Sequence, residues 1–263
     1  MPTFDTPSPV SVRVDVAGGS LRVRAADRID TLVEVRPSNP RSSADIQAAE
    51  QTRVEYREGR LQISSPRRPR LHLFGGMPSV DIDVRLPTGS RVEVSSTAGD
   101  VDCEGRLGDV RVDTKYGDIR IERASAVHAR TTAGDITVAT VDGDGDAGTS
   151  YGGIRIREAA GDLRLDSACG DITVDSALAS VGAVTKYGEV RVGQAVRGSL
   201  VLETAYGAVE AGVREGTAAW LDVAAGTGRV RNLLTPTEGP EGARETVEIR
   251  ARTSYGDVVI RRA

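Results

Sequence analysis

Residues 133–138 read Ala-Gly-Asp-Ile-Thr-Val, and residues 169–174 read Cys-Gly-Asp-Ile-Thr-Val. Most of the chain repeats this unit, in which a glycine and a polar residue precede alternating aliphatic and polar residues. The glycines of the clearest copies are Gly99, Gly117, Gly134, Gly152, Gly170, Gly188 and Gly207, so successive spacings are 18, 17, 18, 18, 18 and 19 residues. A looser copy follows at Gly228 and a clear one at Gly256. Self-similarity at a fixed period is typical of stacked repeat architectures.

Each repeat contains two short strands. At residues 136–138 and 172–174 aliphatic and polar residues alternate, which predicts a strand with one buried face. A second aliphatic strand precedes the first by nine residues, as Leu163 precedes Ile172. From residue 90 onward no segment shows a helical period.

The nearly constant period favours one fold class. Two short strands cannot form a core alone, whereas equal units can stack in parallel ladders about 4.8 Å apart. A β-sandwich, the alternative, would tolerate loops of variable length. We therefore predict an all-β, parallel β-solenoid with about 18 residues per rung. Its aliphatic side chains should form inner columns, with Ile119, Ile136, Ile154 and Ile172 in successive layers.

Residues 1–88 lack this period but still alternate like strands. We expect them to form an N-terminal β-rich cap with one short helix near residues 42–50, because Ser42 and Ser43 precede helix-forming residues. Residues 89–263 then form the solenoid. The Pro-, Gly- and acid-rich stretch 232–245 is expected to be an exposed loop between rungs.

Composition and charge exclude several classes of protein. A net charge of -4 with 27% charged residues gives no general electrostatic reason to bind nucleic acid or an anionic membrane. No apolar stretch approaches 18 residues, and the first residues lack the pattern of a signal peptide. Cys103 and Cys169 are predicted to be reduced thiols. We therefore expect a cytoplasmic protein without a membrane span.

Five tyrosines recur at one position of the repeat: Tyr116, Tyr151, Tyr187, Tyr206 and Tyr255, with Ala133, Cys169 and Ala225 between them. Exposed aromatic rings in a row would form a stacking platform for sugars. Alternatively, large and small corner residues would pack together. Because Val110, Val112 and Thr114 alternate inward, Tyr116 is predicted to point inward as well, which favours packing.

Acidic residues follow most of these glycines and could form a calcium ladder, but the Gly-rich half of calcium-binding β-rolls is missing. We expect these acids to bond to backbone groups at the corner. Asp142, Asp144 and Asp146 form a weak Ca²⁺ candidate, because Gly153 occupies the twelfth position, where an EF-hand loop requires Glu. We therefore expect no metal site and no cofactor.

The segment around residues 64–79 is the least solenoid-like. It joins basic and apolar side chains in a Pro- and Gly-rich context, and it is either a mobile loop or a partner-docking element. The candidate partner-binding residues are Arg67, Arg68, Arg70, Leu71, Leu73 and Phe74. The chain contains no Gly-x-Ser-x-Gly motif, P-loop or paired nucleophile and base, so no catalytic residue is predicted.

With its Gly-Asp-Ile-x-Val rungs, the Ser-Ala-Asp at 43–45 and the ending Ser-Tyr-Gly-Asp-Val at 254–258, the chain resembles a bacterial β-strand-repeat family of unknown function labelled "putative adhesin". It is most similar to actinobacterial members. The resemblance covers nearly the whole chain and implies a right-handed β-helix-like fold. It supplies no catalytic or ligand-binding residues.

We therefore expect a non-catalytic structural or interaction protein that binds a protein partner or itself. The last strand ends close to Ala263, and an exposed parallel edge there would let the chain form a homodimer or a filament. One alternative is a calcium-stabilised adhesive rod. Another is a β-helix carbohydrate-active enzyme, which would need clustered carboxylates beside a groove.

Overall fold

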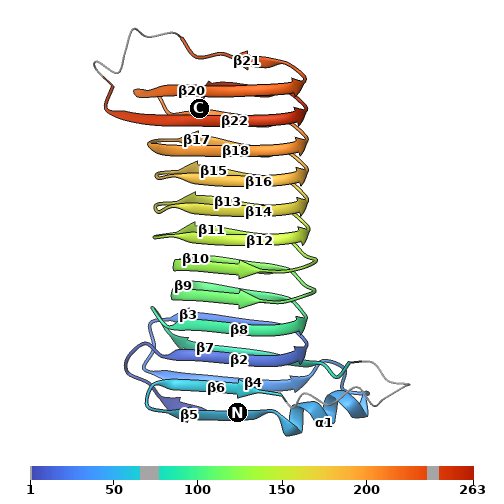
Figure 1. Cartoon of the computed structure of the whole chain (residues 1–263). Helices are drawn as coiled ribbons and strands as arrows, with labels where there is room; N and C mark the ends of the chain where they lie inside the picture. The colour runs from blue at the N-terminus through green and yellow to red at the C-terminus, as the bar shows by residue number, and fades with distance from the viewer. Residues whose placement is uncertain (1, 66–76, 236–242) are drawn as a thin grey trace. The chain divides into compact units, whose positions relative to one another are not determined.

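The structure is a computed structural model that describes residues 2–65, 77–235 and 243–263. The chain divides into two compact units, unit 1 (Met1–Thr132) and unit 2 (Ala133–Ala263). Nearly every element in both units is a β-strand, as the repeat predicts (Figure 1). No helix among the described residues is long and apolar enough to cross a bilayer.

Unit 1 contains ten strands and one helix among its described residues: β1 (Thr3–Asp5), β2 (Ser11–Gly18), β3 (Leu21–Ala26), β4 (Asp30–Pro37), α1 (Ser43–Gln51), β5 (Arg53–Arg57), β6 (Arg60–Ser64), β7 (Val80–Pro87), β8 (Arg91–Ala98), β9 (Val101–Asp113) and β10 (Ile119–Arg130). Its parallel ladders are not in sequence order. Strand β2 lies between β6 and β8, and β3 lies between β7 and β9. Both ladders continue through β9, which pairs with β10 in parallel.

Antiparallel strands close the N-terminal side of unit 1. Strand β4 pairs with β7 and with β1, and β5 pairs with β6. The rings of Phe4 on β1 and Tyr56 on β5 lie 5.2 Å apart. Helix α1 begins after Ser42, whose side chain accepts a hydrogen bond from the Asp45 backbone N–H at 3.3 Å. These elements lie in the region predicted as a cap, although the parallel ladders already include β2 and β3.

Unit 2 is more regular. Its strands are β11 (Ile136–Val141), β12 (Gly145–Tyr151), β13 (Ile154–Ala159), β14 (Leu163–Cys169), β15 (Ile172–Ala177), β16 (Val181–Tyr187), β17 (Val190–Ala195), β18 (Gly198–Tyr206), β19 (Val209–Val213), β20 (Thr217–Thr227), β21 (Val230–Asn232), β22 (Glu245–Tyr255) and β23 (Val258–Arg262). Odd-numbered strands from β11 to β19 form one parallel ladder, and even-numbered strands from β12 to β18 form the other (Figure 1).

The predicted inner columns are present in each unit. In unit 2, Ile136, Ile154 and Ile172 are register partners on successive rungs, and all three side chains are buried. In unit 1, Ile119 is the register partner of Val101. Branched aliphatic side chains on one face of each strand remove the inner surface from water, so the parallel β-solenoid prediction is confirmed.

The end of unit 2 corrects the expectation of an exposed C-terminal edge. Strand β22 lies between β18 and β20 (Figure 1). Strand β23 lies between β19 and β21. The C-terminal strands are therefore internal, and the outermost described rung is formed by β20 and β21. Inner positions of β22 such as Ile249 are fully buried, whereas Leu221 on β20 is only half-buried. The covered rung is more apolar at two paired positions, where Val247 is the partner of Ala219 and Ile260 the partner of Asn232.

Candidate interaction site

The corners of unit 2 require glycine. Gly170 has φ +154°, and a Cβ there would lie 1.9 Å from the carbonyl oxygen of Gly152 on the preceding rung. The corresponding distance at Gly207 is 2.0 Å to the carbonyl oxygen of Gly188. No side chain fits in this space, so the recurring glycine fixes the corner of each rung.

A buried hydroxyl supports each corner and was not predicted from the sequence. These hydroxyl groups donate to the carbonyl oxygen of the corner glycine one rung back, at 2.9 to 3.1 Å, and belong to Thr149, Ser167, Thr185, Thr204 and Thr253. They satisfy carbonyl groups that would otherwise be costly to bury. The sequence does contain a signal for these hydroxyls. In each of these rungs a Ser or Thr stands two residues before the Tyr or Cys that recurs in the repeat.

The tyrosines point outward, so the prediction that Tyr116 packs inward is wrong: in unit 1 this side chain is 58% exposed. In unit 2, Tyr151, Tyr187, Tyr206 and Tyr255 are 48% to 64% exposed. Alternation ends at the corner, as strand β16 illustrates, where Thr185 is buried but both Lys186 and Tyr187 are exposed. The buried hydroxyl takes the last inward position, and the tyrosine after it lies outside the core.

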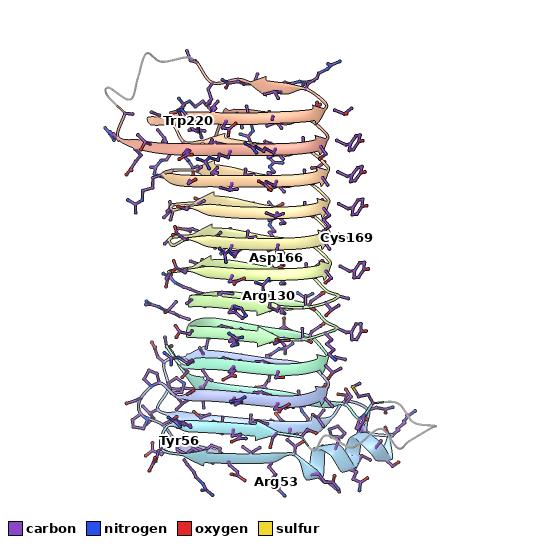
Figure 2. All side chains as sticks on the ribbon, viewed as in Figure 1. Arg53, Tyr56, Arg130, Asp166, Cys169 and Trp220 are labelled. Atoms are coloured by element: carbon purple, nitrogen blue, oxygen red, sulfur yellow. The ribbon has the colours of Figure 1, made fainter. Side chains whose placement is uncertain are left out.

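In unit 2 these residues form one column across the rungs. We call it the tyrosine column: Ala133, Tyr151, Cys169, Tyr187, Tyr206, Tyr255 and Thr227, each the register partner of the next. Thr227 occupies the place predicted for Ala225, which is the register partner of Thr253. Figure 2 shows rings projecting in a row from the edge where Cys169 is labelled.

Three rings of the column are stacked. The centroids of Tyr187 and Tyr206 lie 5.1 Å apart with 6° between the ring planes, and those of Tyr206 and Tyr255 lie 4.9 Å apart with 3° between the planes. The ladder spacing thus holds the rings nearly parallel at a distance typical of favourable aromatic pairs. Cys169 interrupts the column between Tyr151 and Tyr187. It is a half-buried free cysteine, so Tyr151 and Tyr187 have no ring neighbour on that side.

Acidic residues stand beside part of the column, two positions after Ala133, Cys169, Tyr187 and Tyr255. Asp135, Asp171 and Asp257 each accept, at 2.8 to 2.9 Å, a hydrogen bond from the backbone N–H of the register position on an adjacent rung. Asp144 and Asp162 do the same at 3.1 and 3.0 Å. The predicted role in satisfying backbone groups is confirmed, but the donor lies on a different rung. In a parallel stack the nearest free N–H belongs to the neighbouring rung.

The predicted calcium candidates are not gathered into a ligand set. Asp144 is exposed and its Oδ1 accepts the Asp162 N–H, while Asp142 and Asp146 are half-buried and engaged in other interactions. The part of the chain that the structure describes contains no group of three or more His, Cys, Asp or Glu residues that could hold a metal ion. The partner-binding candidates Arg67, Arg68, Arg70, Leu71, Leu73 and Phe74 lie outside the described residues.

Two groups in unit 1 have shifted pKa values. Burial raises the pKa of the Cys103 thiol to about 12, and the charge of Asp102 adds to this shift, so the thiol stays protonated. Burial also raises the pKa of Asp81, but hydrogen bonds from Ser38 and Ser20, and then the charge of Arg36, outweigh it, so the pKa lies below its usual value.

The rung architecture matches a known family. Residues 90–200 match the Toastrack DUF4097 family. This Toastrack region includes the clearest copies of the repeat, and the match confirms the resemblance found in the sequence, a bacterial β-repeat family of unknown function. The predicted similarity to actinobacterial members stays a prediction.

Solved structures resemble the chain in fold. A structure described as a putative adhesin from Bacteroides fragilis matches with a TM-score of 0.50 at 15% identity, covering 100% of this chain and 95% of that one. A putative adhesin from Parabacteroides distasonis gives 0.35 at 10% identity, covering 98% and 95%. A putative cell adhesion protein from Clostridium sporogenes gives 0.22 at 10%, covering 100% and 98%. The fold comparison rests on the first alone. No curated protein matches the chain.

Proposed function

We propose that this protein is a non-catalytic interaction protein, and that the tyrosine column of unit 2 is its contact surface for a protein partner. One observation carries the proposal: four tyrosines are held outside the core with 48% to 64% of their surface exposed. Tyrosine combines a large apolar ring with a hydroxyl group, which is why it is enriched at binding surfaces.

The column is already ordered before any partner binds. The rings of Tyr187, Tyr206 and Tyr255 are stacked within 6° of parallel, and the preceding buried hydroxyls and corner glycines fix the backbone beneath them. A partner would therefore immobilise few additional rotamers on this side of the interface. Lower ordering cost leaves more of the contact energy as affinity.

The acidic residues beside the column fit a binding role better than a catalytic one. The carboxylates of Asp171 and Asp257 each accept a backbone N–H from another rung, so they hold the stack together. The label "putative adhesin" borne by the Bacteroides fragilis protein agrees with an interaction role.

A peptide-array comparison tests the proposal. The wild-type chain is compared with a variant in which Tyr151, Tyr187, Tyr206 and Tyr255 are all replaced by Ser, and with the control Tyr116→Ser, which removes an equally exposed ring in unit 1. We expect a set of peptides that bind the wild type and the control but bind the quadruple variant at least about tenfold more weakly. Equal binding by all three proteins, with the variants folded by circular dichroism, would overturn the proposal.

Self-association through β20 and β21 is the second candidate. Among the described residues each of these strands pairs on one side only, with β22 and β23, and Trp220 on β20 is 60% exposed. Pairing of β20 with β20 of a second copy would form a closed, two-fold symmetric dimer. Sedimentation equilibrium should then show a dimer that Ala224→Pro dissociates, because proline cannot donate to a ladder. A strict monomer at high micromolar concentration would exclude this assembly.

A further inference from the structure

The tyrosine column lacks a ring at Cys169, and we call this place between Tyr151 and Tyr187 the gap. Tyr151 and Tyr187 lie one rung to either side of Cys169. Two rung steps of about 4.8 Å place these residues about 9.6 Å apart. A planar group in van der Waals contact with both rings needs about 7 to 8 Å, and two stacked planar groups need more than about 10 Å. The gap therefore has room for one planar group.

No other ring face of the column meets a second tyrosine of unit 2 across a residue without a ring, and the second face of Tyr151 lies towards Ala133, the first residue of the column. Tyr206 is covered by a stacked ring on both sides. The second face of Tyr255 points towards Thr227, so a group bound there would meet an aromatic ring on one side alone. Within the described part of unit 2, Cys169 is the one column residue without an aromatic ring that has a tyrosine as its register partner on both sides.

The charge beside the gap is negative. Asp171 and Glu189 follow Cys169 and Tyr187 by two positions, and both are exposed. Asp171 uses one carboxylate oxygen to accept the Glu189 N–H at 2.8 Å. Neither carboxylate forms a salt bridge within the described residues, although the exposed, flexible Lys186 stands next to Tyr187 in sequence. A cation bound in the gap would thus meet carboxylate oxygens at its edge.

We propose that this gap binds the guanidinium group of an arginine side chain presented by the protein partner. The guanidinium is planar and weakly hydrated, stacks on aromatic faces, and donates hydrogen bonds to carboxylates from its edge. A lysine ammonium has no plane to fill the gap. A neutral ring or a sugar carries no positive charge, so it gains no charge attraction from Asp171 and Glu189. The proposal rests on the function proposed above, since it names the group that the tyrosine column recognises.

Three acetylated, amidated pentapeptides test this assignment: Gly-Ser-Arg-Ser-Gly and its counterparts with Lys or citrulline in the central position. Citrulline keeps the planar shape of the arginine head group but carries no charge. Titrations followed by NMR of the tyrosine ring resonances should show the arginine peptide binding about tenfold more tightly than either counterpart. Equal affinity for the citrulline peptide, or for the lysine peptide, would overturn the proposal.

Variants locate the site. Cys169→Tyr fills the gap and should abolish binding of the arginine peptide, whereas the control Tyr116→Ser in unit 1 should bind like the wild type. Asp171→Asn keeps an oxygen to accept the Glu189 N–H but removes the charge, and should weaken binding about threefold to tenfold. Thermal unfolding establishes whether each variant is folded. If Cys169→Tyr does not fold, the affinity of Asp171→Asn for the arginine peptide tests the assignment. Unchanged binding in Cys169→Tyr or Asp171→Asn contradicts the assignment.

The two proposals fail separately. Peptides that bind the wild type in the array but not the quadruple tyrosine variant would support the tyrosine column as a contact surface, whatever the result with arginine. If those peptides still bind Cys169→Tyr with wild-type affinity, the contact surface stands and the arginine site does not. If the quadruple variant binds every peptide as the wild type does, both proposals fail.

Discussion

The two units end their ladders in different ways. In unit 1 the antiparallel strands β4 and β5 cover the parallel strands β7 and β6, and Leu61 on β6 is buried. In unit 2 the outermost described rung has no such cover, so Leu221 on β20 is half-buried and Trp220 is exposed. A solenoid built from equal rungs always has a last rung, and a different kind of element must bury it. The following changes test how far this contrast extends.

The largest effect is expected at a corner glycine of unit 2. A Cβ at Gly170 would lie 1.9 Å from a backbone oxygen, whereas a Cβ at Gly59, in the β5–β6 turn of unit 1, meets nothing within 4 Å. Both have positive φ, so Gly59→Ala should cost about 1 kcal/mol and Gly170→Ala about 3 kcal/mol or more. Urea denaturation measures both, and equal costs would contradict the idea that close rung approach demands this glycine.

Matched leucines at the two ladder ends test the effect of cover directly. Leu61→Ala should lower the free energy of unfolding by about 3 kcal/mol, because truncating this buried side chain leaves a cavity. Leu221→Ala should cost about 1 kcal/mol, because its side chain already contacts water. The comparison uses chemical denaturation of both variants. Similar losses at the two positions would mean that the last rung of unit 2 is covered in solution, for example by a second copy.

The corner hydroxyls should contribute less. Thr185 on β16 donates to the Gly170 carbonyl oxygen at 3.0 Å, while Thr114 in unit 1 lies 3.4 Å from the carbonyl oxygen of Tyr116, at the limit of a hydrogen bond. Thr185→Val keeps the shape and should cost about 1 kcal/mol, and Thr114→Val only a few tenths. Thermal unfolding compares the two variants. A larger loss of stability in Thr114→Val than in Thr185→Val would indicate that the geometry of the corner, and not the hydrogen bond, explains the Ser or Thr at this position.

The smallest effect is a pH dependence confined to unit 1. Because hydrogen bonds hold the pKa of Asp81 below its usual 3.8, its ionised form is favoured in the folded protein. The resulting stabilisation is present above the ordinary pKa and is lost as pH falls through the lowered value. Stability measured from neutral pH downward should therefore decrease less steeply in Asp81→Asn than in the wild type. If the stability of the two proteins falls identically as the pH is lowered, the result would contradict this role of Asp81.

The sequence was sufficient for the regular part of the fold. The alternation at Ile136 and Ile154, with a constant spacing between them, allows a single arrangement in which aliphatic side chains of every rung share one interior. The outward direction of the tyrosines was missed, because two-residue alternation was extended past the corner. The buried hydroxyl before each tyrosine shows where alternation ends, and that signal is present in the sequence.

The order of the last rungs was not predictable in the same way. Residues 217–232 and 245–262 both carry the repeat pattern, so each is compatible with a neighbouring place on β18 and β19. Which of the two takes that place depends on which rung gains more free energy when neighbours cover it on both sides. That difference can be judged only by comparing the two complete packed structures. Ile249 and Val247 of β22 are buried there, while their register partners Leu221 and Ala219 on β20 remain partly exposed.

The amino-acid sequence by itself determined the rung, its period and its inner face, because these follow from local alternation and from glycine at positions where no side chain fits. Tertiary structure alone decided the order of the last rungs and the polar contacts between rungs. It placed β22 between β18 and β20, and Asp171 against the backbone of the next rung. Contacts between rungs depend on register and on the order of stacking, and neither is encoded within any one repeat.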